Sequence, residues 1–495
     1  MLKTLAPICW AVVVSFAPPA IVGAEVDAQS LNNWAQWRGP LANGVAPNGN
    51  PPTEWSATKN VKWKVPIAGR GSASPIVWGD RIFILTAIKT DRTAEPKATS
   101  KTDSFQAKFS ALDDSSDNRG NATFALAQND APRPRDGERR GPRGRGPGGP
   151  GGPGGFRPRI DEPTNYYKFN VLAIDRKTGK TIWERTACEV VPHEGHHQTG
   201  SFASASPVTD GKLLYASFGS RGIYCYDLDG NQKWKKDLGD LHMRMSFGEG
   251  SSPALYGNTL VQICDQEQGS FVVALNAKTG DEKWRKERDE VSTWGTPLII
   301  EAAGHMQVIT SGTNRIRSYD LANGDVIWEC GGLGSNPIAC PVAVDGLAIA
   351  MTGHNDPAGI AVPLDSKGDI TESKKYAWRL EGSTPYVPSP LVYGDTVYFI
   401  KSRNAILSSV VAKTGEYIIS QRRLPDMSSV YASPVGAADR VYICSREGVT
   451  LVIKNAKTFD VLATNTLDET IDASPAIVGN DILIRTEGNL YCIGQ

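Results

Sequence analysis

The chain has 495 residues, which is enough for a large core or for several domains. Its 53 basic and 53 acidic residues give a formal net charge of zero. This balance excludes a bulk attraction for nucleic acid or acidic lipid, so no nucleic-acid partner is expected.

Residues 1–24 have the pattern of a cleavable signal peptide. Lys3 precedes an apolar stretch, and Val22-Gly23-Ala24 supplies the small residues of a cleavage site. The stretch contains Pro18-Pro19 and is too short for a membrane span. Cys9 lies inside it and not after it, so no lipidation site is expected. We therefore expect a periplasmic or secreted protein without a transmembrane segment.

A small residue followed by proline recurs along the chain. After a longer first interval, the spacing is roughly 41 to 49 residues. The eight anchor pairs are Ser74-Pro75, Ser206-Pro207, Ser252-Pro253, Thr296-Pro297, Cys340-Pro341, Ser389-Pro390, Ser433-Pro434 and Ser474-Pro475. A repeat of this length indicates a stack of similar supersecondary units.

Each anchor leads into two strand-like runs joined by a tight turn, as in PIVWGDRIFILTA at 75–87. A second hairpin follows, as in LAIDRKTGKTIWE at 172–184. In that turn we expect Asp175 to accept backbone hydrogen bonds and Gly179 to have a positive φ. Four antiparallel strands in 40–45 residues are typical of a β-propeller blade.

A tryptophan ends most of these units, in the outer strand, where its ring could cover the edge of the next blade. The tryptophans are Trp183, Trp234, Trp284, Trp328 and Trp378. Later units diverge, with Tyr417 and Ile418 near the tryptophan position and Phe459 in place of the glycine.

The last unit stops after three strands, and the missing strand is available as NVKWKVPI at 60–67, which contains Trp63. The sequence therefore predicts an all-β, eight-bladed propeller of four-stranded antiparallel blades over residues 60–495, closed by the N-terminal strand. Such closure removes exposed sheet edges. A seven-bladed ring with one degenerate unit is the alternative.

Two segments lie outside the repeat. Residues 25–59 form an irregular lead-in, whose Trp34 and Trp37 are expected to pack against the ring. Residues 89 to about 163 interrupt the first blade between its second and third strands. Their Gly, Pro and Arg content predicts disorder. The insertion is either a tolerated loop or an electrostatic tether for an anionic partner.

AIDRKTGKTIW and ALNAKTGDEKW resemble the tryptophan-docking repeats of pyrroloquinoline-quinone (PQQ) dehydrogenases and of the propeller subunit of the outer-membrane β-barrel assembly machinery. The whole chain resembles exported PQQ-like repeat proteins without an assigned activity. The resemblance implies the propeller, and for function it implies either a scaffold or a quinoprotein. The barrel-assembly subunit is a lipoprotein, and the missing lipidation site argues against that role.

Quinoprotein dehydrogenases hold PQQ beside Ca²⁺ on the axis, and many have a disulfide between adjacent cysteines. This chain has no Cys-Cys pair. Trp294 could serve as a stacking floor, but Glu249, Asp265 and Asp472 are scattered and form no recognisable calcium site. PQQ is therefore not expected.

The loops that enter the innermost strands, together with the turns between second and third strands, should surround one mouth of the ring, here called the funnel face. HEGHH at 193–197 is the densest chemical motif there. It matches the HExxH zinc motif, but Pro192 and Gly195 disfavour the necessary helix. A looser divalent metal site of His193, Glu194, His196 and His197 remains open, beside the alternative of hydrogen-bonded loop histidines.

Other candidates on the funnel face are charged or aromatic. Arg221, Arg315 and Arg403 occupy comparable turns and form either a cationic ring for a carboxylate or sulfate, or ordinary solvated turns. Trp294, Tyr386 and Tyr431 precede inner strands and either stack on a ligand or plug the axis. Glu249 and Asp472 complete the candidate ligand-binding set.

The seven cysteines after the signal peptide are expected to be buried thiols, with a Cys330–Cys340 bridge as the exception. The function expected from the sequence is a binding or assembly scaffold that takes a protein, peptide or glycan at the funnel face. The alternatives are a PQQ- and calcium-dependent dehydrogenase, or a metal-dependent hydrolase or lyase that uses the HEGHH loop.

Overall fold

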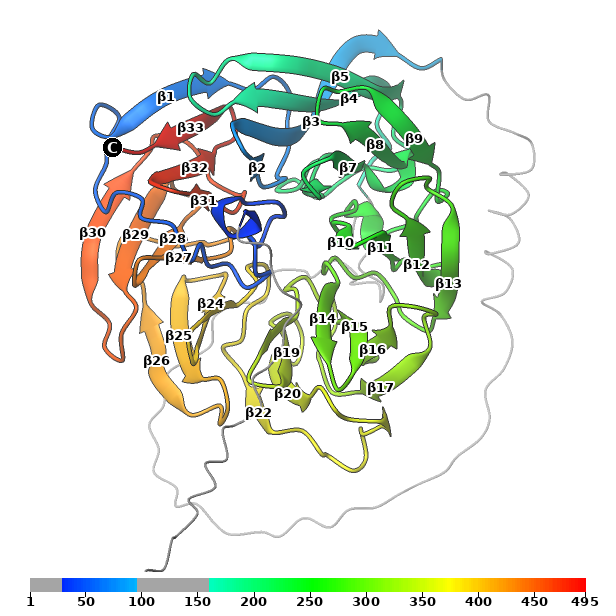
Figure 1. The fold of residues 1–495 in the computed structure, drawn as a ribbon, viewed down its shortest axis with the longest axis vertical. Helices are drawn as coiled ribbons and strands as arrows, with labels where there is room; N and C mark the ends of the chain where they lie inside the picture. Colours follow the sequence, from blue (N-terminus) through cyan, green and yellow to red (C-terminus); the bar gives the residue numbers. More distant parts are fainter. Residues whose placement is uncertain (1–28, 96–159) are drawn as a thin grey trace, which may run out of the picture. The chain divides into compact units, whose positions relative to one another are not determined.

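The computed structural model describes residues 29–95 and 160–495. Eight antiparallel sheets are arranged around a central axis, which confirms the predicted eight-bladed propeller (Figure 1). Contacts divide the chain into residues 1–93 with 160–495, and residues 94–159. Only Ala94 and Glu95 of the second group are described, so the account below concerns the first.

The first four blades are built from strands in chain order, from the axis outward. Blade 1 contains β2 (Ile76–Trp78), β3 (Arg81–Thr93), β4 (Asn165–Asp175) and β5 (Thr181–Val190). Blade 2 contains β6 (Val208–Thr209), β7 (Leu213–Ser217), β8 (Ile223–Asp227) and β9 (Gln232–Lys236). Blade 3 contains β10 (Ala254–Tyr256), β11 (Thr259–Cys264), β12 (Ser270–Asn276) and β13 (Glu282–Arg288). Blade 4 contains β14 (Leu298–Ala302), β15 (His305–Thr310), β16 (Ile316–Asp320) and β17 (Val326–Cys330).

The last four blades follow the same plan. Blade 5 contains β18 (Val342–Val344), β19 (Leu347–Thr352), β20 (Ala358–Pro363) and β22 (Trp378–Glu381). Blade 6 contains β23 (Leu391–Tyr393), β24 (Thr396–Lys401), β25 (Ile406–Val411) and β26 (Tyr417–Arg423). Blade 7 contains β27 (Val435–Ala437), β28 (Arg440–Cys444), β29 (Val449–Lys454) and β30 (Val461–Thr466). Blade 8 contains β31 (Ala476–Val478), β32 (Asp481–Arg485), β33 (Asn489–Ile493) and β1 (Val61–Pro66).

The ring is closed by β1, which pairs antiparallel with β33 and places Trp63 opposite Cys492. Strands from both ends of the ring's sequence thus form one sheet, as predicted, and the seven-bladed alternative is wrong. Every blade packs both faces against its neighbours, so the middle strands are largely buried, and β11 is buried along its whole length.

The small residue of each anchor forms part of a continuous ring of hydrogen bonds. Its backbone N–H donates to the side chain of the next blade's anchor. In chain order the pairs are Ser74 to Ser206 (2.9 Å), Ser206 to Ser252 (2.8 Å), Ser252 to Thr296 (3.1 Å), Thr296 to Cys340 (3.0 Å), Cys340 to Ser389 (2.9 Å), Ser389 to Ser433 (2.8 Å), Ser433 to Ser474 (2.9 Å) and Ser474 to Ser74 (3.0 Å). Eight buried N–H groups are satisfied in this way, which explains why the anchor residue carries a small hydroxyl or thiol.

The outer tryptophans join each blade to the next. Their indole N–H donates to a carbonyl in the following blade's outer hairpin, at 2.7–3.0 Å: Trp63 to Arg176, Trp183 to Leu228, Trp234 to Ala277, Trp284 to Leu321 and Trp378 to Ala412. Each ring lies on the glycine of that hairpin, and a Cβ there would come within 2.6–2.8 Å of the indole: Gly179, Gly230, Gly280, Gly324 and Gly415. These glycines also have positive φ, so glycine is favoured both by the backbone of the turn and by the close approach of the indole ring.

The repeat fails where one half of this pair is missing. Trp328 of blade 4 finds no such hairpin in blade 5, because residues 364–377 extend outward and add β21 (Gly368–Asp369) parallel to β17. Its indole N–H donates instead to Gln307 Oε1 at 3.2 Å, and the side chain is fully buried. In blade 6, Ile419 is the residue that pairs at the tryptophan position, next to the predicted Tyr417 and Ile418. The large Phe459 stands in the facing turn of blade 7.

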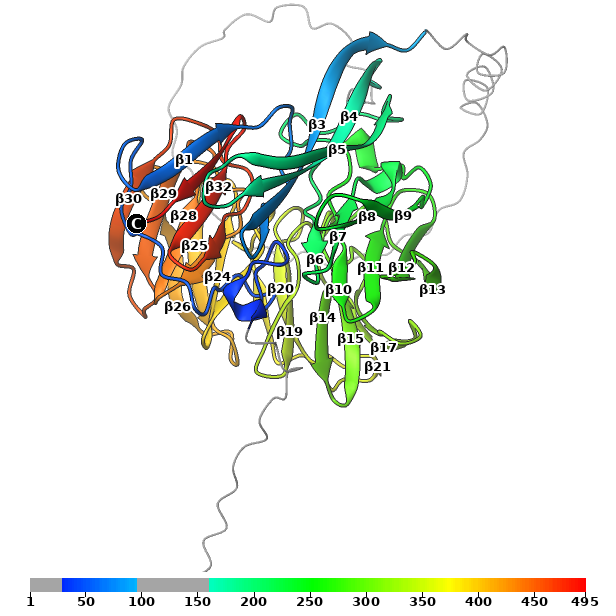
Figure 2. The same cartoon turned by 45° about the horizontal axis from the view of Figure 1, so that its top comes forward.

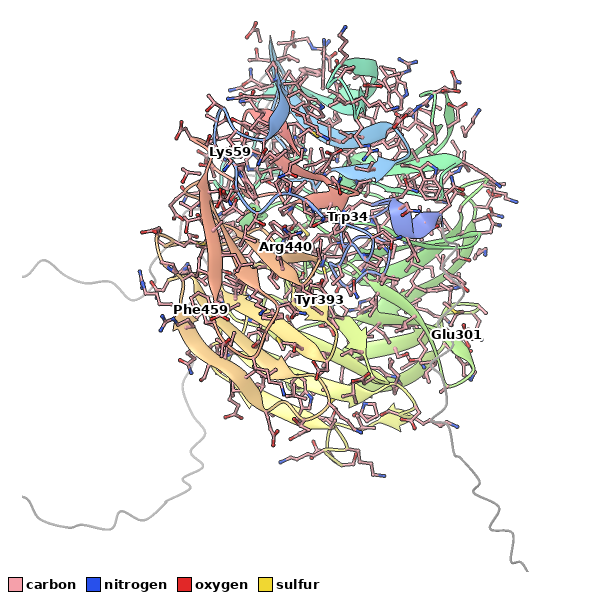
Figure 3. All side chains as sticks on the ribbon, turned by 60° about the vertical axis from the view of Figure 1, so that its left-hand side comes forward. Trp34, Lys59, Glu301, Tyr393, Arg440 and Phe459 are labelled. Atoms are coloured by element: carbon pink, nitrogen blue, oxygen red, sulfur yellow. The ribbon has the colours of Figure 1, made fainter. Side chains whose placement is uncertain are left out.

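The lead-in fills one end of the axis, and we call residues 29–53 the plug. Backbone bridges join Trp34 to Val77 of β2 and Val45 to Gly436 of β27. Trp34 is fully buried, as predicted, and Trp37 is half-buried. The segment with the short helix η1 (Ser30–Asn32) crosses the centre in Figures 1 and 2. Figure 3 labels Trp34 near the middle of the view and Phe459 at the edge of the molecule.

A buried arginine completes the plug. The Arg38 guanidinium donates to the carbonyl oxygens of Pro434 (3.0 Å) and Pro390 (2.7 Å).

The plug also reaches the turns that follow the inner strands, where the N–H of Gly79 donates to Asn33 Oδ1 at 2.7 Å and the N–H of Asn50 donates to the carbonyl of Gly479 at 2.8 Å. These turns lie at the opposite end of the inner strands from the loops that enter them. The funnel face is therefore the other mouth of the ring.

The insertion leaves blade 1 between its second and third strands, as predicted. β3 and β4 continue pairing as far as Thr93 opposite Asn165, beyond the expected boundary at residue 89. The Arg-rich core of the insertion, like the signal peptide at 1–24, lies outside the described residues.

All seven cysteines of the described ranges are free thiols, as expected, and the Cys330–Cys340 bridge considered as an exception does not form. Cys340 instead accepts a hydrogen bond in the anchor ring, and Cys330 is buried in blade 4. Among the described residues, no helix is long and apolar enough to cross a membrane.

Candidate functional site

Two neighbouring loops of the funnel face carry most of the histidines. Loop 1 (191–207) joins β5 to β6, and loop 2 (237–253) joins β9 to β10. The 193–197 stretch has no helical turn, so the HExxH zinc geometry does not form. The backbone N–H of His197 donates to the carbonyl of Phe247 at 2.9 Å, and this bond ties the two loops together.

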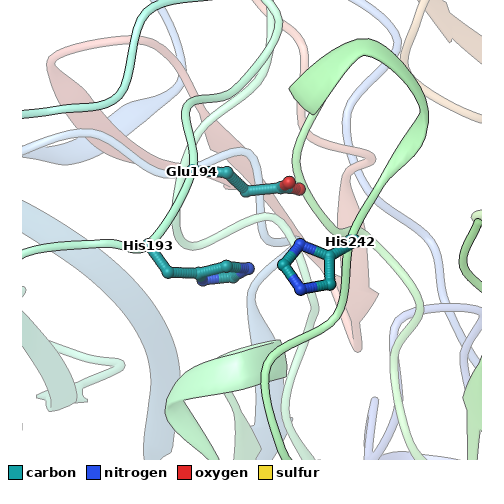
Figure 4. A group of neighbouring side chains, drawn as sticks. All are labelled: His193, Glu194 and His242. Atoms are coloured by element: carbon teal, nitrogen blue, oxygen red, sulfur yellow. The ribbon is translucent and has the colours of Figure 1, made fainter. Parts of the chain in front are cut away.

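His193 and Glu194 of loop 1 meet His242 of loop 2. One potential ligand atom from each lies within 4.8 Å of the other two. Figure 4 shows both imidazole rings and the carboxylate turned toward a common space between the loops. Glu194 is buried, and its Oε1 accepts the backbone N–H of Met243 at 3.0 Å, which fixes the carboxylate in this direction.

Both nitrogens of His193 have partners. Nε2 lies 2.8 Å from the carbonyl oxygen of Leu241, and Nδ1 lies 3.1 Å from a guanidinium nitrogen of Arg221. Asp240 Oδ1 is 3.8 Å from Nδ1 and forms an ion pair with Arg221. Burial lowers the pKa of His193, so the ring is neutral at physiological pH.

His196 and His197 do not join this group, contrary to the predicted cluster of four residues. His196 Nδ1 lies 2.7 Å from the carbonyl oxygen of His197, and its ring packs edge-on against Phe202. His197 Nδ1 lies 2.8 Å from Thr199 Oγ1. Successive residues of an extended loop point in different directions, which separates these rings from His193.

Behind the histidine group lies a small cavity that includes Glu249. Its carboxylate accepts hydrogen bonds from the backbone N–H and Oγ of Ser220, at 2.8 and 2.6 Å. Burial, reinforced by the charge of Glu194, raises the pKa of Glu249 to about 7. The cavity has a volume of about 50 Å³ and is lined also by Phe169, Phe202 and Gln262. This space suits one or two waters.

The three arginines considered for a cationic ring do not form one. Arg221 is turned to Asp240, and Arg315 lies 3.7 Å from Asp369 of β21, toward the outer edge of its blade. Only Arg403 stays exposed and forms no ion pair within the described ranges. Equivalent turn positions therefore give different side-chain directions.

Aromatic and basic side chains from distant blades meet around the axis. The positive charges of Arg446 and Arg403 contribute, after burial, to lowering the pKa of His197. Burial raises the pKa of Tyr386, and the positive charges of Arg403 in blade 6 and Arg244 in loop 2 act in the opposite direction. Arg446 lies 4.7 Å from the ring centre of Tyr431 and bonds Asp472 at 2.6 Å. We call Arg244, Tyr386, Arg403, Tyr431 and Arg446 the funnel cluster.

The repeats and this geometry can be compared with known proteins. The profile of the family described as outer membrane protein assembly factor BamB (PQQ_2) matches residues 168–337 and 272–495, about two thirds of the chain. The chain belongs to this family. A search of the curated proteins found no match.

Solved structures share the fold of this BamB-family chain. Quinohemoprotein alcohol dehydrogenase ADHIIG of Pseudomonas putida HK5 is 10% identical, with 95% of this chain and 81% of that chain covered and a TM-score of 0.55. Quinohemoprotein alcohol dehydrogenase of Comamonas testosteroni is 10% identical, covering 94% and 81%, with a TM-score of 0.54. BamB of Moraxella catarrhalis is 13% identical, covering 66% and 91%, with a TM-score of 0.47.

The acids considered for a calcium site in this BamB-family propeller have other partners. Asp265 forms a fully buried ion pair with Arg288, at 2.7 Å, and also accepts a hydrogen bond from Thr293. Asp472 is held by Arg446, and Glu249 by Ser220. Trp294 donates its indole N–H to the carbonyl of Gly248 at 2.7 Å, which makes it part of the loop 2 packing.

Sequence reasoning missed three residues of this site in the BamB-family chain: His242, Arg244 and Arg446. His242 is the single histidine of loop 2. It becomes a candidate metal ligand because the fold places its ring beside that of His193. Arg446 follows β28 in a position comparable to Arg403, so the turn alignment that selected Arg403 could have found it.

Proposed function

We propose that the protein is an exported binding scaffold whose funnel cluster holds an acidic partner, a peptide or glycan that carries carboxylate or sulfate groups. The observation that carries this proposal is the pair Arg244 and Arg403. Both side chains are exposed, and neither forms an ion pair within the described part of the chain.

The charge pattern supports an anionic partner. Arg446 is compensated by Asp472, whereas the Arg244 guanidinium donates to the neutral Asn336 at 3.3 Å and meets no carboxylate among the described residues. Guanidinium groups offer paired donors that match carboxylates and sulfates. Tyr386 and Tyr431 add flat surfaces on which a sugar ring or a peptide plane can stack.

The plug supports binding from the funnel face. The plug covers the mouth opposite the funnel face, and Arg38 reaches from it to the carbonyls of Pro434 and Pro390, so a ligand meets the axis from the loop side. Export rests on residues 1–24, which are outside the described ranges, and N-terminal sequencing of the mature protein should find Glu25 first.

The alternative, a PQQ- and calcium-dependent dehydrogenase, has less support. The three acids do not fit a calcium site because each has another partner, and a cavity of about 50 Å³ is smaller than a cofactor pocket of a few hundred Å³. Incubation with PQQ and Ca²⁺ followed by a dye-reduction assay distinguishes the two functions, and dye reduction would favour the enzyme.

The experiment that tests the scaffold measures binding of immobilised polyglutamate, a sulfated polysaccharide and neutral dextran to the purified protein. We expect binding to at least one acidic polymer and none to dextran. Arg403→Ala and Arg244→Ala should each weaken it roughly tenfold, because each removes a charge-assisted hydrogen bond.

The matched control is Arg315→Ala, which removes an arginine from the comparable turn of blade 4 and should leave binding unchanged. The proposal fails if no acidic polymer binds, or if Arg315→Ala weakens binding as much as Arg403→Ala. The two acidic polymers distinguish a carboxylate-bearing peptide from a sulfated glycan.

A further inference from the structure

Three side chains at the contact between loops 1 and 2 have no part in the binding proposed for the funnel cluster. His193 and His242 supply imidazole nitrogens and Glu194 supplies a carboxylate oxygen, with one atom from each inside a 4.8 Å span. In an occupied site, ligand atoms about 2.0–2.2 Å from an ion lie roughly 3–3.5 Å apart. Closure of the present spacing requires only small side-chain movements.

We propose that His193, Glu194 and His242 form a binding site for a divalent transition metal of the zinc class. Two imidazoles and one carboxylate are a ligand set that zinc and related ions favour, whereas Ca²⁺ and Mg²⁺ prefer oxygen atoms. The site joins two loops from successive blades and does not depend on what the funnel cluster binds.

The surroundings orient each ligand. The backbone N–H of Met243 holds the Glu194 carboxylate at 3.0 Å. Asp240 stands 3.8 Å behind Nδ1 of His193, so an imidazole that binds through Nε2 has a carboxylate to receive its other N–H. Such a carboxylate behind a histidine ligand is a usual feature of metal sites.

The apo contacts of His193 also indicate what the metal replaces. An ion at Nε2 takes the place of the Leu241 carbonyl contact, and the proton then moves to Nδ1, where Arg221 can no longer donate. Arg221 keeps its ion pair with Asp240. Three protein ligands leave a fourth position for a water, beside the small cavity.

His196 provides a matched control. It belongs to the same loop and to the HEGHH motif, yet its Nδ1 is engaged with the carbonyl of His197 and its ring with Phe202. If the metal binds the group that the fold brings together, binding requires His242 and not His196. If it binds the HEGHH motif, binding requires His196 and not His242.

The test uses full-length mature protein, purified without a histidine tag and treated with a chelator. Zn²⁺ is titrated by calorimetry, and Co²⁺ by its visible absorption. We expect one ion per chain. His242→Ala should weaken binding roughly 100-fold or more, since loss of even an outer partner of a metal ligand reduces affinity 10–100-fold.

His196→Ala should bind as the wild type does. His242 is exposed, so its variant is expected to fold, and circular dichroism and the thermal midpoint check this for both. The proposal is overturned if the wild type takes up no ion, if His196→Ala loses as much affinity as His242→Ala, or if His242→Ala retains wild-type affinity.

Discussion

The backbone N–H of Ser474 donates to the hydroxyl of Ser74 at 3.0 Å and so closes a hydrogen-bond ring that passes through all eight blades. These residues are 400 positions apart in the sequence. The ring lies at the start of the inner strands, directly beneath the funnel face. It fixes the positions from which the loops of the candidate sites emerge.

Loss of one hydroxyl from this ring should destabilise the protein. Ser252→Ala removes the acceptor of the Ser206 N–H, now 2.8 Å away, and leaves that buried donor unsatisfied. We expect a loss of about 1–3 kcal/mol in the free energy of unfolding, measured by urea denaturation. Ser252→Thr is the control because Thr296 has the same role in the next blade. Equal destabilisation by Ala and Thr would contradict the hydrogen-bond explanation.

Docking of tryptophan on glycine makes a second prediction. In Gly280→Ala, the new Cβ would lie 2.8 Å from the Trp234 ring, in a residue with φ of +78°. Gly269→Ala has a φ of +80° but nothing within 4 Å. Both variants incur the positive-φ strain of about 1 kcal/mol, and only Gly280→Ala adds overpacking of about 1–3 kcal/mol. Thermal midpoints should therefore rank Gly269→Ala above Gly280→Ala, and the opposite order would count against docking.

Glu469 links both ends of the ring. Burial opposes its charge, but hydrogen bonds from Thr486, Asn489 and Tyr491 and the ion pair with Lys64 of β1 lower its pKa to about 2. A lowered carboxyl pKa means that the stabilisation is present above pH 4.5 and is lost as the pH falls toward 2. Because the side chain is about one fifth exposed, we expect about 1–2 kcal/mol.

Glu469→Gln should therefore be less stable than the wild type at pH 7, and the difference should shrink at pH 3. Thermal midpoints at the two pH values measure this. The control Glu54→Gln changes an exposed carboxyl that pairs with Lys59, and we expect no comparable effect. A difference between Glu469→Gln and the wild type that stays constant with pH would contradict the assignment.

The sequence was sufficient for the fold because its signals are local. Each anchor, hairpin and tryptophan lies within one repeat. The last repeat lacks a fourth strand, and the segment with Trp63 supplied it. The anchor ring was not predicted, because its hydrogen bonds run between blades. Of the three residues in the proposed metal site, His193 and Glu194 were predicted and His242 was not: adjacency in HEGHH suggested His196, whereas the fold brings His242 to His193 from the next loop.

Side-chain direction was the other limit. Arg221, Arg315 and Arg403 occupy comparable turns, but a nearby Asp240 or Asp369 turns the first two away from the axis. These acids lie outside the turns that carry the arginines, so the sequence of a turn does not predict the direction of its arginine. The Cys330–Cys340 bridge failed similarly, since Cys340 belongs to the anchor ring.

The N-terminal closure makes a final prediction. A chain that begins at Ile67 lacks β1, so β33 becomes an unpaired edge and the Glu469 ion pair with Lys64 is lost. Exposed edges pair with other chains, and we expect oligomers or aggregates in gel filtration. A chain that begins at Asn60 lacks the plug but keeps β1. It should elute as the full-length protein does, with a lower thermal midpoint, because the carbonyls that Arg38 now satisfies lose their partner. If both truncations behave alike, closure by β1 is not what prevents association through the β33 edge.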